Sequence, residues 1–77
     1  MNREEAVKIV MTMLEKNVEG LKMTEDQMDT DLIDLGVDSL GVMVVMLDVS
    51  EAAGVTISDD SAEELDTPAK IVEFITA

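Results

Sequence analysis

The sequence predicts an all-α protein, a small four-helix bundle with three main helices and a short third helix. Three segments carry apolar residues at helical spacing, and each follows a residue type that commonly caps a helix N-terminus. A chain of 77 residues is expected to form a single domain, residues 1–77. Because a domain of this size buries only roughly 60% of its unfolded surface, close packing of its apolar residues must stabilise the fold.

The first helix is expected at residues 3–17. Asn2 followed by Glu5 is similar to a capping box. The apolar residues at i, i+3, i+4, i+7 and i+11 form one helical face, which Ile9 and Met13 widen: Val7, Val10, Met11, Leu14 and Val18. The pattern fades after Asn17, and Gly20 is a candidate stop signal.

Residues 18–38 contain no long periodic segment and are expected to form a loop. A loop of this length is uncommon in a small domain unless it is held in place or functional. The residues expected to hold it against the core are its scattered apolar ones: Leu21, Met23, Met28, Leu32, Ile33, Leu35 and Val37.

The second helix is expected from Ser39 to about Ala53, with Asp38 as its N-cap and Gly54 as its stop. Its predicted core face consists of Val42, Val45, Met46, Val49 and Ala53. Its other faces carry Leu40, Met43, Val44 and Leu47. The first two turns are therefore apolar on nearly every side. Because full burial of such a helix is difficult in so small a bundle, we expect a partner to cover part of it.

The remainder of the chain predicts two shorter helices. Residues 55–57 are β-branched and are expected to form an extended connector. The acidic stretch after Ser58 is expected to form one short helix over 59–64, with carboxylates favourably near its N-terminus. Thr67 and Pro68 suit the N-cap and the first position of a last helix over 68–76. The apolar side of that helix consists of Ile71, Val72, Phe74 and Ile75.

The composition excludes several classes of function. The chain has no cysteine and no histidine, so it lacks disulfides, thiolate metal sites and the commonest general base. No catalytic residue is predicted. No metal site is predicted either, because a calcium loop starting at Asp29 would place Ile33, Asp34 and Leu40 where a polar ligand, a glycine and a glutamate are required. The seven methionines are expected to fill the core.

The net charge of −13 is concentrated after the first helix. Residues 1–23 contain four basic and four acidic side chains, whereas residues 24–77 contain fourteen acidic side chains and one basic side chain, Lys70. Nucleic acids and anionic membranes are excluded as partners because they carry the same sign. Proteins with basic docking patches are favoured. No segment is typical of a membrane span or a signal peptide, so we expect a cytoplasmic monomer.

Ser39 lies at the start of the second helix, after a glycine-containing turn and the acidic cap Asp38. Free backbone N–H groups and the positive end of the helix dipole favour an anion at this position, such as a phosphodiester. No histidine is present to activate Ser39 as a nucleophile. The residues alone leave two interpretations open: a serine that another enzyme modifies, or a serine that only helps to begin a helix.

The segment Leu35-Gly36-x-Asp38-Ser39-Leu40 resembles the phosphopantetheine attachment signature of the acyl carrier protein family. The resemblance extends over almost the whole chain in length, acidity and helix layout. It implies that a phosphopantetheinyl transferase uses coenzyme A and magnesium to attach 4'-phosphopantetheine to Ser39. The thiol of that group then holds an acyl group as a thioester. It also implies that Asp38 assists the transferase–metal complex and that Gly36 shapes the turn. The candidate cofactor site is therefore Ser39, Asp38, Leu40 and Gly36.

The resemblance further implies partner enzymes that dock on the second helix: the phosphopantetheinyl transferase, an acyltransferase, a ketosynthase or other synthase enzymes. The expected recognition surface is Leu40, Met43, Val44, Leu47, Asp48 and Glu51. Fatty-acid carriers of this family are usually acidic in the turn after the serine, whereas this turn reads Gly41-Val42-Met43-Val44. The difference favours a specialised carrier of polyketide or related secondary biosynthesis that docks through apolar contacts. Alternatively, Val44 and its neighbours pack under the first loop or an attached chain.

Two other functions are alternatives. Asp38-Ser39-Leu40-Gly41 and Thr67-Pro68 are mildly similar to D-alanyl carrier proteins, which are loaded by an adenylating enzyme. Outside the carrier class, an acidic helical adaptor without a prosthetic group would explain the charge and the apolar second helix. It would not explain the signature around Ser39.

Overall fold

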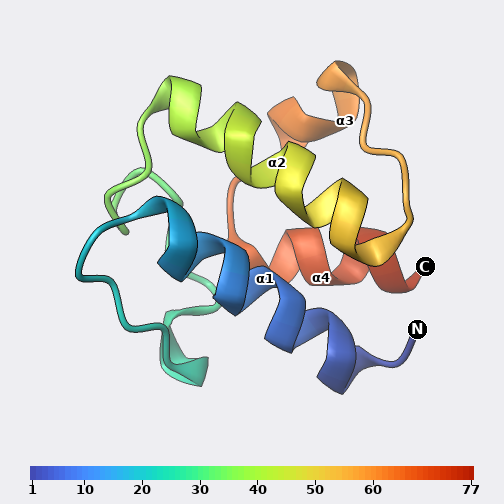
Figure 1. The fold of residues 1–77 in the computed structure, drawn as a ribbon, viewed down its shortest axis with the longest axis horizontal. Coiled ribbons are helices and arrows are strands. Elements are labelled where there is room, and N and C mark those ends of the chain that lie inside the picture. Colours follow the sequence, from blue (N-terminus) through green and yellow to red (C-terminus); the bar gives the residue numbers. More distant parts are fainter.

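The helices pack around one apolar core, with the first and last helices side by side (Figure 1). The computed structural model describes residues 1–77 as α1 (Arg3–Asn17), the 3-10 helix η1 (Glu25–Gln27), α2 (Ser39–Ala53), α3 (Asp59–Glu64) and α4 (Pro68–Thr76). Helix α1 packs against both α2 and α4, and the two chain termini lie at the same end of the molecule (Figure 1). The predicted all-α four-helix fold is confirmed, whereas η1 was not predicted.

Helices α1, α2 and α4 begin at the predicted caps, and α3 begins after Ser58, which was not predicted as a cap. The cap side chains each accept the backbone N–H three residues later, and they are Asn2, Asp38, Ser58 and Thr67. Gly54 ends α2 in the left-handed conformation, with φ of 68°, as predicted. Two details were wrong. The Glu5 side chain does not complete a capping box with Asn2, and Gly20 is not the stop, because α1 ends at Asn17 with the extended Val18 as its C-cap. The predicted bounds of α1, 3–17, are confirmed.

The core is formed by one face of each long helix. Its fully buried members include Val10 and Leu14 of α1, Val45 and Val49 of α2, and Ile71 and Val72 of α4. Burying each such side chain stabilises the fold by roughly 1.5–3 kcal/mol. Ala6 is also fully buried and was not predicted, because alanine is equally common on exposed helix faces.

The long first loop is held against the bundle by backbone hydrogen bonds to α4 and its entrance. The Leu32 N–H donates to the Asp66 carbonyl at 2.9 Å, and the Ala69 N–H donates to the Met28 carbonyl at 2.8 Å. Five of the seven apolar residues expected to hold this loop are buried: Met23, Met28, Leu32, Leu35 and Val37. Leu21 is half-buried. The expectation for Ile33 was wrong, because its side chain is 58% exposed.

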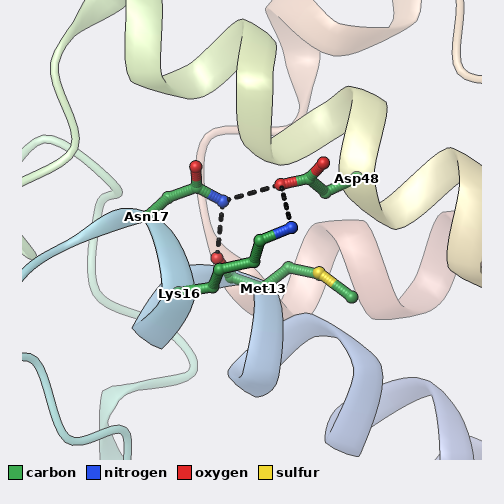
Figure 2. Close-up of polar contacts among 4 residues, drawn as sticks. All are labelled: Met13, Lys16, Asn17 and Asp48. Atoms are coloured by element: carbon green, nitrogen blue, oxygen red, sulfur yellow. Dashed lines mark hydrogen bonds and ion pairs between the residues drawn. The ribbon is translucent and has the colours of Figure 1, made fainter.

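A polar contact joins the end of α1 to the middle of α2 (Figure 2). The Asn17 side-chain amide donates to the Asp48 carboxylate at 3.0 Å and to the Met13 carbonyl at 2.8 Å. Lys16 Nζ lies 3.7 Å from the same Asp48 oxygen. The Asp48 side chain is only 18% exposed, so its carboxylate is enclosed between the two helices. None of the helices is long and apolar enough to cross a membrane.

Candidate attachment site at the start of the second helix

Ser39 is the first residue of α2, and Asp38 fixes its position. The Asp38 carboxylate accepts the Gly41 N–H at 2.6 Å, and the Asp38 carbonyl accepts the Val42 N–H at 2.9 Å. The Ser39 side chain is exposed, and its hydroxyl makes no hydrogen bond within the protein. The N–H groups of Ser39 and Leu40 also lack an acceptor in the chain. A free hydroxyl beside two free N–H groups suits a covalently attached anion.

The turn before Ser39 is rigid. Gly36 has a φ of +103°, which strains any L side chain, and a Cβ there would lie 3.2 Å from Val18 Cγ1. Leu35 and Val37 on either side of this glycine are buried. The Val37 N–H donates to the Leu32 carbonyl at 3.0 Å. These contacts hold the cap and the serine in place relative to the core.

Four apolar side chains of α2 face solvent and form what we call the apolar stripe. Its members and their exposed fractions are Leu40 (80%), Met43 (47%), Val44 (46%) and Leu47 (59%). The exposure of Val44 excludes the alternative in which this side chain packs under the first loop. Glu51 is also exposed, one turn beyond Leu47.

Asp48 lies apart from the other residues expected to recognise partners. Its carboxylate contacts Asn17 and Lys16 of α1, so it faces the helix pair and not the apolar stripe (Figure 2). The sequence pattern could not show whether Asp48 faces solvent or the neighbouring helix, because it is adjacent to both the exposed Leu47 and the buried Val49.

A groove of about 640 Å³ runs beside Ser39 between the first loop, α2 and α3. Its apolar lining comprises Leu32, Ile33, Val42, Met43, Ala62 and Leu65. Its acidic residues are Asp31, Asp59, Glu63 and Asp66. Sequence reasoning did not find this groove, because α3 contributes to it from positions far from Ser39 in the chain.

The groove has an acidic rim without a free cation. Lys70 is the one basic residue after residue 23, and its Nζ lies 2.8 Å from Asp66 Oδ1. This hydrogen bond lowers the pKa of the Asp66 carboxyl and raises the pKa of Lys70. Because Lys70 is paired with Asp66, the other acidic residues of the groove, Asp31, Asp59 and Glu63, make the local charge negative. No three carboxylates lie close enough together to hold a metal ion.

Comparison with known proteins shows which family the chain belongs to. The family model described as phosphopantetheine attachment site matches residues 8–75. An acyl carrier protein of Guillardia theta is 30% identical over 77 residues, covering 99% of this chain and 94% of that relative. An acyl carrier protein of Exiguobacterium sibiricum is 45% identical over 42 residues, covering 54% of this chain and 53%, about half, of that relative.

Proposed function

Because the chain belongs to the acyl carrier protein family, a group of non-enzymatic carriers that work with synthase and transferase enzymes, we propose that Ser39 is its phosphopantetheine attachment residue. The observation that supports this assignment is the exposed Ser39 hydroxyl at the N-terminus of α2, free of any partner in the protein. The neighbouring N–H groups of Ser39 and Leu40 are available to the phosphodiester that attachment would create.

Attachment requires a reaction that this chain cannot catalyse by itself. The Ser39 oxygen attacks the phosphorus of coenzyme A that bears the pantetheine arm, and the bond from this phosphorus to the rest of the diphosphate breaks. The hydroxyl proton passes to a base on the transferase, and adenosine 3',5'-bisphosphate leaves. Once attached, the arm supplies a thiol, which a chain without cysteine lacks.

Asp38 is proposed to act on the transferase complex as well as on the helix. Its carboxylate is negatively charged and lies one residue from the position of the new phosphodiester, so the two groups repel each other unless a cation lies between them. A magnesium ion brought by the transferase with coenzyme A would satisfy both groups. Asp38 therefore has a reason to be acidic beyond helix capping, for which serine or asparagine would serve equally well.

We further propose a specialised pathway, of polyketide or related secondary biosynthesis. The support is the turn after Ser39, which is acidic in fatty-acid carriers but here reads Gly41-Val42-Met43-Val44 and contributes the exposed Met43 and Val44 to the apolar stripe. An acyltransferase or a ketosynthase would dock on this surface, with Glu51 at its far end. Asp48 is left out of the surface, because its carboxylate is held by α1.

The acidic rim of the groove favours one second candidate, an aminoacyl carrier. Asp31, Asp59 and Glu63 would attract the ammonium group of an aminoacyl thioester. Loading distinguishes the two candidates: an aminoacyl carrier is charged by an adenylating enzyme with ATP, and a polyketide carrier by an acyl or malonyl donor.

The test of the attachment site is the intact mass of the protein after incubation with coenzyme A, magnesium and a broad-specificity phosphopantetheinyl transferase. The wild-type chain is expected to gain one phosphopantetheine, and Ser39→Ala is expected to gain none. Ser61→Ala is the matched control, since it removes another serine hydroxyl near a helix N-terminus and should leave the mass gain unchanged. A folded, unmodified wild-type chain that gains no mass would favour the adaptor without a prosthetic group.

A further inference from the structure

Ile33 is an exposed apolar side chain in a loop whose other apolar residues are buried or half-buried. Its exposed fraction of 58% is close to that of Leu47 on the apolar stripe. Its neighbour Leu32 is 1% exposed and fills the core, so the turn directs adjacent side chains to opposite environments. Packing of the core therefore does not explain the choice of isoleucine at position 33.

The turn holds Ile33 in this exposed position. The Ile33 N–H donates to the Asp31 side chain at 3.0 Å, and the Ile33 carbonyl accepts the Gly36 N–H at 3.1 Å. The Leu32 N–H is bonded to the Asp66 carbonyl on the other side of the turn. A partner that contacts Ile33 thus meets a side chain on a preformed backbone and loses little conformational entropy in binding it.

Ile33 and one member of the apolar stripe, Met43, line the same groove beside Ser39. Ile33 belongs to the loop, Met43 belongs to α2, and Ser39 is part of the same lining. The groove therefore brings the exposed apolar side chain of the loop and one end of the apolar stripe to the attachment residue.

The charges around this surface are acidic apart from Lys70, which is paired with Asp66. Asp31 and Asp34 flank Ile33 in the loop, and Asp59 and Glu63 face it from α3. A second copy of this chain would bring the same acids and a net charge of −13, so self-association through this face is disfavoured. A protein with apolar residues ringed by lysine and arginine is complementary to it in both respects.

On the basis of the proposed function, we propose that Ile33 and the apolar stripe form a single docking surface at the attachment groove. Its occupant is an enzyme that acts at Ser39 or on the attached arm and that offers an apolar contact ringed by basic residues. Contact on α2 alone would leave the orientation of the carrier free about that helix. A second apolar contact on the loop fixes the orientation and directs Ser39 toward the active site of the enzyme.

The test uses the full chain and a broad-specificity phosphopantetheinyl transferase, with kcat/KM for modification of Ser39 measured at low and at moderate ionic strength. Ile33→Asn is expected to lower kcat/KM about tenfold at both ionic strengths, mainly through KM, because it removes an apolar contact. The matched control is Asp34→Asn in the same exposed turn. It should lower kcat/KM only about twofold, and only at low ionic strength, because it removes a screened charge. Ile33→Ala, a smaller change, is expected to have an intermediate effect.

The outcomes separate this proposal from the proposed function. A wild-type chain that is never modified would contradict the attachment site itself. Modification of Ile33→Asn at the wild-type kcat/KM would overturn the docking role of Ile33 while leaving Ser39 as the attachment residue. A further experiment attaches an octanoyl group to the phosphopantetheine arm of the modified chain. If the octanoyl group raises the melting temperature of the wild type but not of Ile33→Asn, and kcat/KM is unchanged, the carried acyl chain covers Ile33 and the proposal is wrong.

Discussion

Replacing Asp48 by alanine tests whether the contact between α1 and α2 stabilises the fold. The substitution removes the acceptor of the Asn17 hydrogen bond at 3.0 Å and the partner of Lys16 at 3.7 Å (Figure 2). A hydrogen bond to a charged group contributes about 1.5–3 kcal/mol. The Lys16 pair is discounted to about 0–0.5 kcal/mol, because the lysine is largely exposed and screened by solvent. Removing one negative charge from a chain with a net charge of −13 relieves repulsion, which partly offsets this loss of stability.

The expected net effect of Asp48→Ala is a loss of about 1–2 kcal/mol in the free energy of unfolding. In a domain of this size, each kcal/mol lowers the melting temperature by about 4–8 °C, so the variant should melt roughly 4–16 °C below the wild type. The assay is thermal and urea unfolding followed by circular dichroism.

A double-mutant cycle with Asn17→Ala isolates the contact from the other consequences of each change. The expected coupling energy between Asn17 and Asp48 is about 1 kcal/mol or more, since neighbours that share a hydrogen bond do not add independently. Lys16→Met should lower stability by less than about 0.5 kcal/mol, because its ion pair is exposed. A coupling energy near zero, with Asp48→Ala as stable as the wild type, would refute the structural role assigned to Asp48.

Four further predictions concern the attachment site and the charge. Asp38→Asn should keep the helix cap and the stability of the fold but slow modification of Ser39 at least about tenfold. Asp38→Ala should slow modification and also lower the free energy of unfolding by about 1 kcal/mol. Unfolding measures the effect on stability, and mass spectrometry measures the effect on modification. Val44→Glu should raise the transferase KM and leave the melting temperature within a few degrees, because Val44 is exposed; a large loss of stability would mean that Val44 belongs to the core. Gly36→Ala should lose about 1–3 kcal/mol in urea unfolding, because φ is +103°. Magnesium and mild acid should both raise the melting temperature, because each relieves repulsion between carboxylates in a chain with a net charge of −13. The Asp66–Lys70 pair opposes that trend slightly, because the lowered pKa of Asp66 means that its contribution to stability is present above pH 3.8 and is lost as the pH falls through the lower folded-state pKa.

The helices could be predicted closely because their signals are local. Asp38 and Gly54 bound α2 through hydrogen bonds within a few residues, and Thr67 and Pro68 begin α4 in the same way. Apolar spacing then identified the core faces, because each buried face repeats along a single helix. The position of Ser39 followed from the start of α2, since an exposed first residue needs no knowledge of the rest of the fold.

The features that could not be predicted depend on contacts between distant segments. Ile33 and Leu32 are both large aliphatic residues, and which of them enters the core depends on how the loop docks on the bundle, where the Leu32 N–H donates to the Asp66 carbonyl. Asp48 and Glu51 are likewise both acids on α2, but only Asp48 meets Asn17. The groove requires α3 to lie beside the first loop, and no pattern within either segment encodes that arrangement.

The high negative charge makes the exposed apolar surface tolerable. Contiguous exposed apolar side chains usually promote association between copies of a protein. Here each copy carries a charge of −13, and acids from the first loop and α3 line the same groove as Ile33 and Met43. Two copies therefore repel each other at the distance where their apolar surfaces would meet, whereas a basic enzyme is attracted. In the proposed docking, charge would select the partner enzyme and speed its approach, and the apolar contact would set how long the enzyme stays bound.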